Sequence, residues 1–104
     1  LTRQGYHIIA RNVRFGPGEI DVIAEHHEIL VFIEVKAHRH REQGLRAVHR
    51  NKQYRISRAA TGWLAKHHEY HQHYCRFDVV LILPASGWHL SPKVEHIQDA
   101  FRPY

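Results

Sequence analysis

Three acidic residues and one lysine stand at alternating positions within two stretches of the sequence that are otherwise apolar. They are Glu19, Asp21, Glu34 and Lys36. Burying an unpaired carboxylate is costly, so an acid inside a run such as Ile29–Val35 needs a partner of opposite charge. Carboxylates gathered on one surface bind hard divalent cations, which prefer oxygen ligands. The pattern therefore indicates a metal site, and the alternative is that Lys36 neutralises Glu34 or Glu19 on a half-exposed face.

Two predicted strands carry these residues. Glu19–Glu25 and Ile29–Ala37 are separated by only three residues, His26, His27 and Glu28. Such a short connection favours an antiparallel hairpin. We place a two-residue turn at the two histidines.

The register of this hairpin decides which charged side chains meet. With the turn at the histidines, Asp21 lies opposite Phe32 and Glu19 lies opposite Glu34. Because side chains alternate between the faces of a strand, the three acids and Lys36 then share one face. Asp21 and Glu34 become diagonal neighbours at roughly 7–8 Å, a gap that one cation with its oxygen ligands can bridge.

The remaining segments predict an α/β fold. A weak strand over Tyr6–Val13 precedes the hairpin, and an amphipathic helix over Arg50–His67 follows it. Phe77–Leu83 reads as a strongly apolar strand and Lys93–Ile97 as a short edge strand. The charged segment Arg39–Arg46 lacks an apolar period and is predicted as an exposed, mobile loop. The order is β-β-β-α-β with a closing strand, and the helical crossover favours parallel pairing of the strands that it joins.

Composition sets the class of protein. The 104 residues suffice for one domain, and 43% hydrophobic with 24% charged residues is an ordinary globular balance. No apolar run approaches the roughly 20 residues of a membrane span. The single Cys75 excludes an internal disulfide, which fits a reducing compartment. We therefore expect a cytoplasmic protein without a membrane association.

Basic residues gather directly after the acidic hairpin. Of the 15 Lys and Arg residues, which give a net charge of +5, eight lie between Lys36 and Arg58, with Glu42 as the only acid among them. Such a surface attracts nucleic-acid phosphates without sequence preference, although a solvated helix face is the alternative. Gln53 could also reach the acidic site from the start of the helix. The predicted nucleic-acid-binding residues are Arg39, Arg41, Arg50, Lys52, Gln53, Arg55 and Arg58.

The 12 histidines raise a second metal hypothesis. His67 and His71 stand four residues apart and could chelate Zn²⁺ on a continuing helix. The interpretation that we favour is a histidine-rich helix C-terminus that interacts with the helix dipole and water. Farther along, Arg76 and Asp78 flank Phe77 on one strand and predict a structural ion pair.

Several short motifs, in a characteristic order along the chain, carry a resemblance to a known family. They are Gly18-Glu19-Ile20-Asp21, then Val31–Lys36, Arg76–Val80, and Glu95-His96-Ile97 close to Ala100-Phe101. Over about Gly5 to Phe101 the chain resembles the YraN-type family of small bacterial proteins. That family has the restriction-endonuclease-like fold, is similar to archaeal Holliday-junction resolvases, and consists mostly of proteins known only as predicted endonucleases. The family normally begins with a helix that carries a further Glu, and this chain begins at or just after the end of that helix.

The resemblance implies a site. Asp21, Glu34 and Lys36 match the PD-(D/E)xK nuclease signature, and Glu19 is a further candidate catalytic acid. Mg²⁺ or Mn²⁺ would be held by Asp21 and Glu34 with the carbonyl oxygen of Val35, while Lys36 would orient or deprotonate the attacking water. Junction-cleaving relatives dimerise, so a second copy of the chain in a homodimer is one candidate partner, although the sequence does not determine the oligomeric state.

The expectation is therefore one nuclease-like domain over residues 1–104, an α/β protein with a restriction-endonuclease-like mixed sheet. Its function would be metal-dependent hydrolysis of phosphodiester bonds in nucleic acid, with branched DNA as one candidate substrate. The alternative is a non-catalytic nucleic-acid-binding module of the same fold. A histidine-rich metal-binding protein is the third interpretation.

Overall fold

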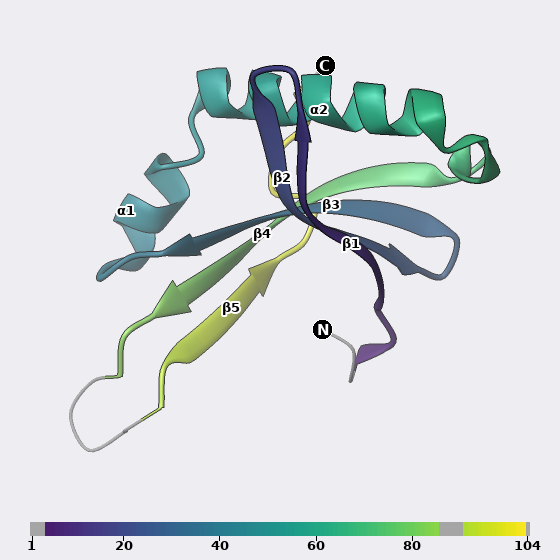
Figure 1. Ribbon diagram of the computed structural model, residues 1–104. Coiled ribbons are helices and arrows are strands. Elements are labelled where there is room, and N and C mark those ends of the chain that lie inside the picture. The colour runs from purple at the N-terminus through teal and green to yellow at the C-terminus, as the bar shows by residue number, and fades with distance from the viewer. Residues whose placement is uncertain (1–3, 86–90, 104) are drawn as a thin grey trace.

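The computed structural model describes residues 4–85 and 91–103, so the Ser86-Gly87 turn that the sequence also predicts lies outside the described residues. The described residues form one five-stranded sheet with the strand order β1-β2-β3-β4-β5 (Figure 1). All neighbouring strands pair antiparallel except β3 and β4, which are parallel. The strands are β1 (His7–Phe15), β2 (Gly18–His26), β3 (Ile29–Ala37), β4 (Tyr74–Leu83) and β5 (Lys93–Ile97).

The connection between the parallel strands contains the helices: α1 (Arg41–Arg46), α2 (Arg50–Lys66) and the short 3₁₀ helix η2 (His68–Tyr70). Figure 1 shows α2 lying across one face of the sheet, with the tip of the β1–β2 hairpin rising toward it. The predicted helix, the parallel crossover and the mixed α/β fold are confirmed. No helix among residues 4–85 and 91–103 is long and apolar enough to span a bilayer.

The core on the α2 face fixes the helix against β3 and β4. Ile56 and Trp63 of α2 are buried there. The ring of Phe32 lies 5.4 Å from that of Phe77, and the Trp63 ring meets Phe32 edge-on at 6.4 Å. Because buried aromatic side chains remove a large apolar area from water, these contacts hold α2 against the sheet.

The sequence predicts Arg39–Arg46 as an exposed, mobile loop, and this prediction is wrong for Arg41–Arg46, which forms helix α1. Gly44 is buried, and a Cβ atom there would lie 2.7 Å from Leu81 Cδ2 on β4. Glu42 and Arg46 also form an ion pair at 3.9 Å, one turn apart. A helix this short shows no apolar period, and its packing against β4 stabilises it.

The two faces of the sheet hold different residues. Leu30 and Phe32 of β3 lie in the core under α2, whereas Val31 and Ile33 lie in a second apolar cluster with Tyr6 on the opposite face. Strand alternation therefore places Glu34 and Lys36 on the α2 face. The candidate site follows from this placement.

Candidate functional site

The turn of the β2–β3 hairpin lies one residue later than predicted. His27 and Glu28 form it with positive φ angles of 50° and 65°, so His26 pairs with Ile29. No sequence signal marks this turn, because neither residue is a Gly, Asn or Asp that favours positive φ. The predicted pairing of Asp21 with Phe32 is therefore wrong.

The corrected register keeps Asp21, Glu34 and Lys36 on one face. Ile23 takes the place opposite Phe32, a shift of two residues along β2. Because side chains alternate with a period of two, such a shift leaves each side chain on its face. Asp21 consequently moves toward Glu34 rather than away from it.

Asp21 and Glu34 meet where β2 and β3 diverge. Regular pairing of the two strands ends at the pair Val22 and Ile33. Beyond this pair, residues 18–21 of β2 lie beside β1, and residues 34–37 of β3 lie beside β4. At this point the Val35 N–H donates a 2.7 Å hydrogen bond to Asp21 Oδ2. A side-chain carboxylate thus satisfies the peptide N–H that follows the end of the ladder, and it does so directly beside Glu34.

Glu34 is buried between two lysines. Its exposed fraction is 4%, and the Nζ atoms of Lys36 and Lys52 each lie 3.6 Å from the same oxygen, Glu34 Oε1. Burial raises the pKa of Glu34 from an ordinary 4.5 to about 7, assisted by the hydrogen bond and charge of Asp21 and opposed by the two lysines. Burial likewise lowers the pKa of Lys36, as does its contact with Lys52, while the charge of Glu34 raises it. A carboxyl group whose pKa is shifted by burial and specific charged neighbours is typical of functional sites.

The donor set fits a hard divalent cation. Asp21 and Glu34 supply two carboxylates in contact with each other, and the Val35 N–H that donates to Asp21 is not itself a cation ligand. Mg²⁺ is commonly bound by one or two carboxylates, with water and substrate phosphates completing its coordination. Residues 4–85 and 91–103 hold no cluster of three or more His, Cys, Asp or Glu side chains placed for a metal, so the site offers two carboxylates rather than a complete protein cage.

Glu19 does not join these groups. Its carboxylate accepts a 3.0 Å hydrogen bond from Arg14 on the neighbouring strand. Ile20 and Ile23 are both buried in the core under α2 although they are three residues apart, so strict alternation of faces does not hold between them. The prediction for Glu19 depended on that alternation.

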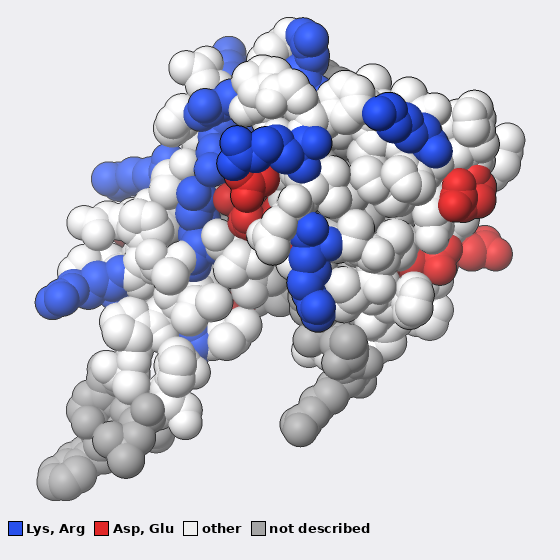
Figure 2. Space-filling model, in the orientation of Figure 1, with Lys and Arg blue, Asp and Glu red and all other residues white. Residues whose placement is uncertain are grey.

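The predicted basic residues divide into exposed and engaged groups. Arg39, Arg50, Arg55 and Arg58 are exposed, whereas Lys52 reaches inward to Glu34. Figure 2 shows Lys and Arg side chains around a small acidic patch on the displayed face.

Four of the predicted binding residues already have partners within the protein: Lys52 contacts Glu34, Arg58 donates to the Tyr54 hydroxyl at 3.1 Å, and Arg41 and Gln53 are also engaged. Arg41 Nε donates to both carboxylate oxygens of Glu95 at 2.9 Å. Gln53 Nε2 donates to the carbonyl oxygen of Val48 at 2.9 Å, within the connection that precedes α2. Lys52, one residue earlier, is therefore the side chain that reaches the acidic site from the helix.

The histidines after α2 complete the helix end. His67 Nδ1 lies 2.8 Å from the Trp63 carbonyl oxygen, and His71 Nε2 lies 2.6 Å from that of Leu64. Both imidazoles thus contact carbonyl groups in the last turns of α2, and the carbonyl of Leu64 also accepts the backbone N–H of His67. The contacts support the helix-end interpretation rather than the Zn²⁺ site.

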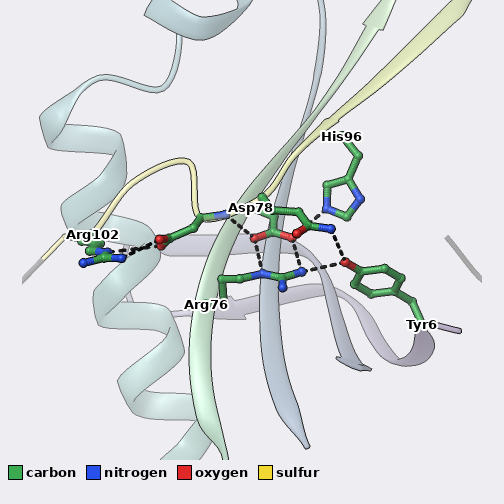
Figure 3. Close-up of polar contacts among 7 residues, drawn as sticks. Tyr6, Arg76, Asp78, His96 and Arg102 are labelled. Carbon is green, nitrogen blue, oxygen red and sulfur yellow. Dashed lines mark hydrogen bonds and ion pairs between the residues drawn. The ribbon is translucent and has the colours of Figure 1, made fainter. Parts of the chain in front are cut away.

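The predicted pair of Arg76 and Asp78 is present and belongs to a larger buried network on the opposite face of the sheet (Figure 3). Arg76 donates twice to Asp78 at 2.8 Å, and His96 Nε2 lies 2.7 Å from Asp78 Oδ2. Arg76 also donates to the hydroxyl of Tyr6 at 2.6 Å, and the Asp99 N–H donates to Asp78 at 2.9 Å. These contacts tie both ends of the described chain to the centre of the sheet.

Bacterial proteins of one family are similar to this chain over nearly its whole length. Residues 1–82 match the uncharacterised protein family UPF0102. A UPF0102 protein of Symbiobacterium thermophilum is 47% identical over 103 residues, which cover 97% of this chain and 85% of that protein. One from Magnetococcus marinus is 40% identical over 105 residues, covering 98% and 82%, and one from Alcanivorax borkumensis is 42% identical over 103 residues, covering 97% and 81%. The chain belongs to the UPF0102 family, the YraN family that its motifs resemble.

Proposed function

We propose that this protein is a metal-dependent nuclease that hydrolyses phosphodiester bonds in nucleic acid, with DNA as the expected substrate. The observation that carries the proposal is the buried Glu34, which meets Asp21 and two lysines where β2 and β3 diverge. Exposed arginines at the start of α2 and before it supply positive charge for the phosphate backbone. The cytoplasm is the proposed compartment.

Each residue of the site has a chemical role in this proposal. Asp21 and Glu34, with the carbonyl oxygen of Val35, would hold Mg²⁺ or Mn²⁺. The bound cation supplies a Lewis acid that polarises a phosphoryl oxygen. Lys36, beside Glu34, orients the attacking water or takes its proton as the new P–O bond forms and the bond to the leaving oxygen breaks. The leaving oxygen takes its proton from solvent.

Metal binding in this proposal competes with a proton. Because the pKa of Glu34 is about 7, a large fraction of Glu34 in the metal-free protein is protonated at neutral pH. A cation must displace that proton, so the apparent affinity for Mg²⁺ rises as the pH increases through 7.

A specific observation also favours a second candidate, the non-catalytic nucleic-acid-binding module. Without a metal, Glu34 has two lysines beside it and a raised pKa that lets it hold a proton, so the fold does not require a cation there. In that case the exposed arginines would bind the backbone and no bond would be cleaved.

Cleavage of labelled DNA separates the two candidates. Linear duplex, single-stranded and four-way-junction DNA are incubated with the protein in Mg²⁺, Mn²⁺ or EDTA. We expect metal-dependent cleavage that Asp21→Asn and Lys36→Ala each reduce at least about 100-fold. Glu69→Gln, at an exposed acid in η2, is the matched control and should cleave at the wild-type rate. DNA binding without cleavage by the wild type, or cleavage that survives Lys36→Ala, would overturn the nuclease proposal.

A further inference from the structure

Lys52 holds a position that its neighbours on α2 do not share. It lies in the first turn of the helix, where there is no acidic residue, and its Nζ is 3.6 Å from Glu34 Oε1. Its side chain is only 31% exposed, whereas Arg55 and Arg58 are exposed on the helix surface. Lys52 therefore belongs to the acidic site by contact, although it stands in a basic stretch of the sequence.

Helix geometry explains the orientation of Lys52. Ile56 and Ala59, four and seven residues later, are buried against the sheet. Residues at this spacing lie on one side of an α-helix, so Lys52 extends the sheet-facing side of α2 at its N-terminal end. The aromatic contacts of Trp63 with Phe32 hold that side of the helix over β3.

The two ammonium groups reach one carboxylate oxygen from two elements. Lys36 comes from β3 and Lys52 from α2, and both lie at the same distance from Glu34 Oε1. With Asp21 and Glu34, the site holds two acids and two lysines. A divalent cation bound to the acids neutralises them, and the lysines then lack an anionic partner within the site. The negatively charged phosphate of the substrate is an anion that such a site would attract.

We propose that Lys52 is a further catalytic residue, whose ammonium group leaves Glu34 when the metal binds and instead contacts a non-bridging oxygen of the scissile phosphate. This inference rests on the proposed nuclease function. Lys52 stabilises the negative charge that grows on the phosphate during attack, and it takes no proton itself. Lys36 and Lys52 thus have separate tasks, one toward the water and one toward the phosphate.

The test compares Lys52→Ala and Lys52→Arg with Lys66→Ala. Lys66 carries the same charge on the same helix, 14 residues later and therefore about 21 Å along the axis. Two quantities are measured: kcat and KM for a labelled DNA that the wild type cleaves, at saturating Mg²⁺, and the Mg²⁺ concentration that gives half of the maximal thermal stabilisation without DNA. Lys52→Gln, which keeps part of the side-chain stem, is used in the same assays if the alanine variant does not fold.

We expect Lys52→Ala to lower kcat about 100-fold, while its Mg²⁺ midpoint stays equal to or below that of the wild type. Lys52→Arg should recover part of kcat, and Lys66→Ala should keep wild-type values. A purely structural role, in which Lys52 only holds Glu34 in place, would instead weaken Mg²⁺ binding, and extra Mg²⁺ would restore kcat. That restoration, or a kcat of Lys52→Ala equal to that of the wild type, overturns the inference alone. A wild type that cleaves no DNA overturns the proposed function and this inference together.

Discussion

Two buried carboxylates on opposite faces of the same sheet are held in contrasting ways. Asp78 is fully buried and accepts hydrogen bonds of 2.8–2.9 Å from Arg76 and the Asp99 N–H, with His96 at 2.7 Å. Glu34 is 4% exposed, has two lysines at 3.6 Å, and lies against a second acid, Asp21. Asp78 has short hydrogen bonds from its partners, whereas Glu34 has two longer ion pairs and a second acid beside it.

The difference indicates what each carboxylate does. Charge-assisted hydrogen bonds from a guanidinium group and a backbone N–H are short and strong, so the Asp78 network stabilises the fold. Glu34 has a raised pKa and long ion pairs, which leave it able to exchange its partners for a cation. One carboxylate stabilises the structure, and the other is the one that we propose to bind a cation.

The largest expected effect on stability is that of replacing Asp78. Asp78→Asn removes the charge that neutralises the half-buried Arg76 and leaves the network incompletely bonded. We expect the free energy of unfolding to fall by about 3–5 kcal/mol, the usual cost of breaking a buried ion pair. Urea denaturation at pH 7 measures it. A loss below about 1 kcal/mol would contradict the structural role of Asp78.

Glu34→Gln should change the free energy of unfolding in the opposite direction and make the protein more stable. The carboxyl of Glu34 has a higher pKa in the folded protein than in the unfolded chain, so the folded state binds the proton more tightly. Its contribution to the free energy of unfolding therefore falls as pH rises from about 4.5 to about 7, and it stays low above that range. We expect Glu34→Gln to be more stable than the wild type by about 2 kcal/mol at pH 8.

The pH dependence provides the control for Glu34→Gln. The stability difference should shrink toward zero near pH 4.5, where Glu34 is protonated in the folded protein. Urea denaturation in EDTA at several pH values gives the profile. A variant that is less stable than the wild type at pH 8 would show that the lysine contacts of Glu34 outweigh its burial.

Added Mg²⁺ should stabilise the wild type more than variants of the Glu34 site. At ten times its Kd, Mg²⁺ should stabilise the wild type by about 1.4 kcal/mol through linkage. Asp21→Asn and Glu34→Gln should lose this response, because a neutral amide is a poor ligand for a hard cation. The Asp78→Asn variant should retain it, since Asp78 lies on the other face. Thermal melting with and without Mg²⁺ measures the response, and equal responses in all four proteins would exclude a metal site at Asp21 and Glu34.

The smallest effect concerns the exposed charges around the Glu34 site. Replacing Arg50, Arg55 and Arg58 together with Gln should reduce the slope of log affinity for duplex DNA against log salt by about 0.9 for each phosphate that the variant no longer neutralises. Fluorescence anisotropy at several salt concentrations measures the slope. Arg11→Gln, at an exposed site on the edge strand β1, is the single-charge comparison. If the triple variant kept the wild-type slope, the nucleic-acid contacts would lie elsewhere.

The local pattern of the sequence determined most of the fold. Apolar periodicity placed α2 and the central strands, and the length of the crossover predicted the parallel pairing of β3 and β4, which is confirmed. The grouping of Asp21 and Glu34 was also predictable. The hairpin turn is one residue from its predicted place, yet alternation preserves the shared face through a shift of two residues.

Contacts between distant segments decided the rest. Packing of Gly44 against Leu81 stabilises α1, and the position of α2 over β3 brings Lys52 to Glu34. Neither contact has a sequence signature, because each depends on how a helix crosses the sheet. Glu19 pairs with Arg14 through the register of the β1–β2 hairpin instead of joining the site. The sequence by itself determined which residues could form a site, and only tertiary packing decided which of them meet.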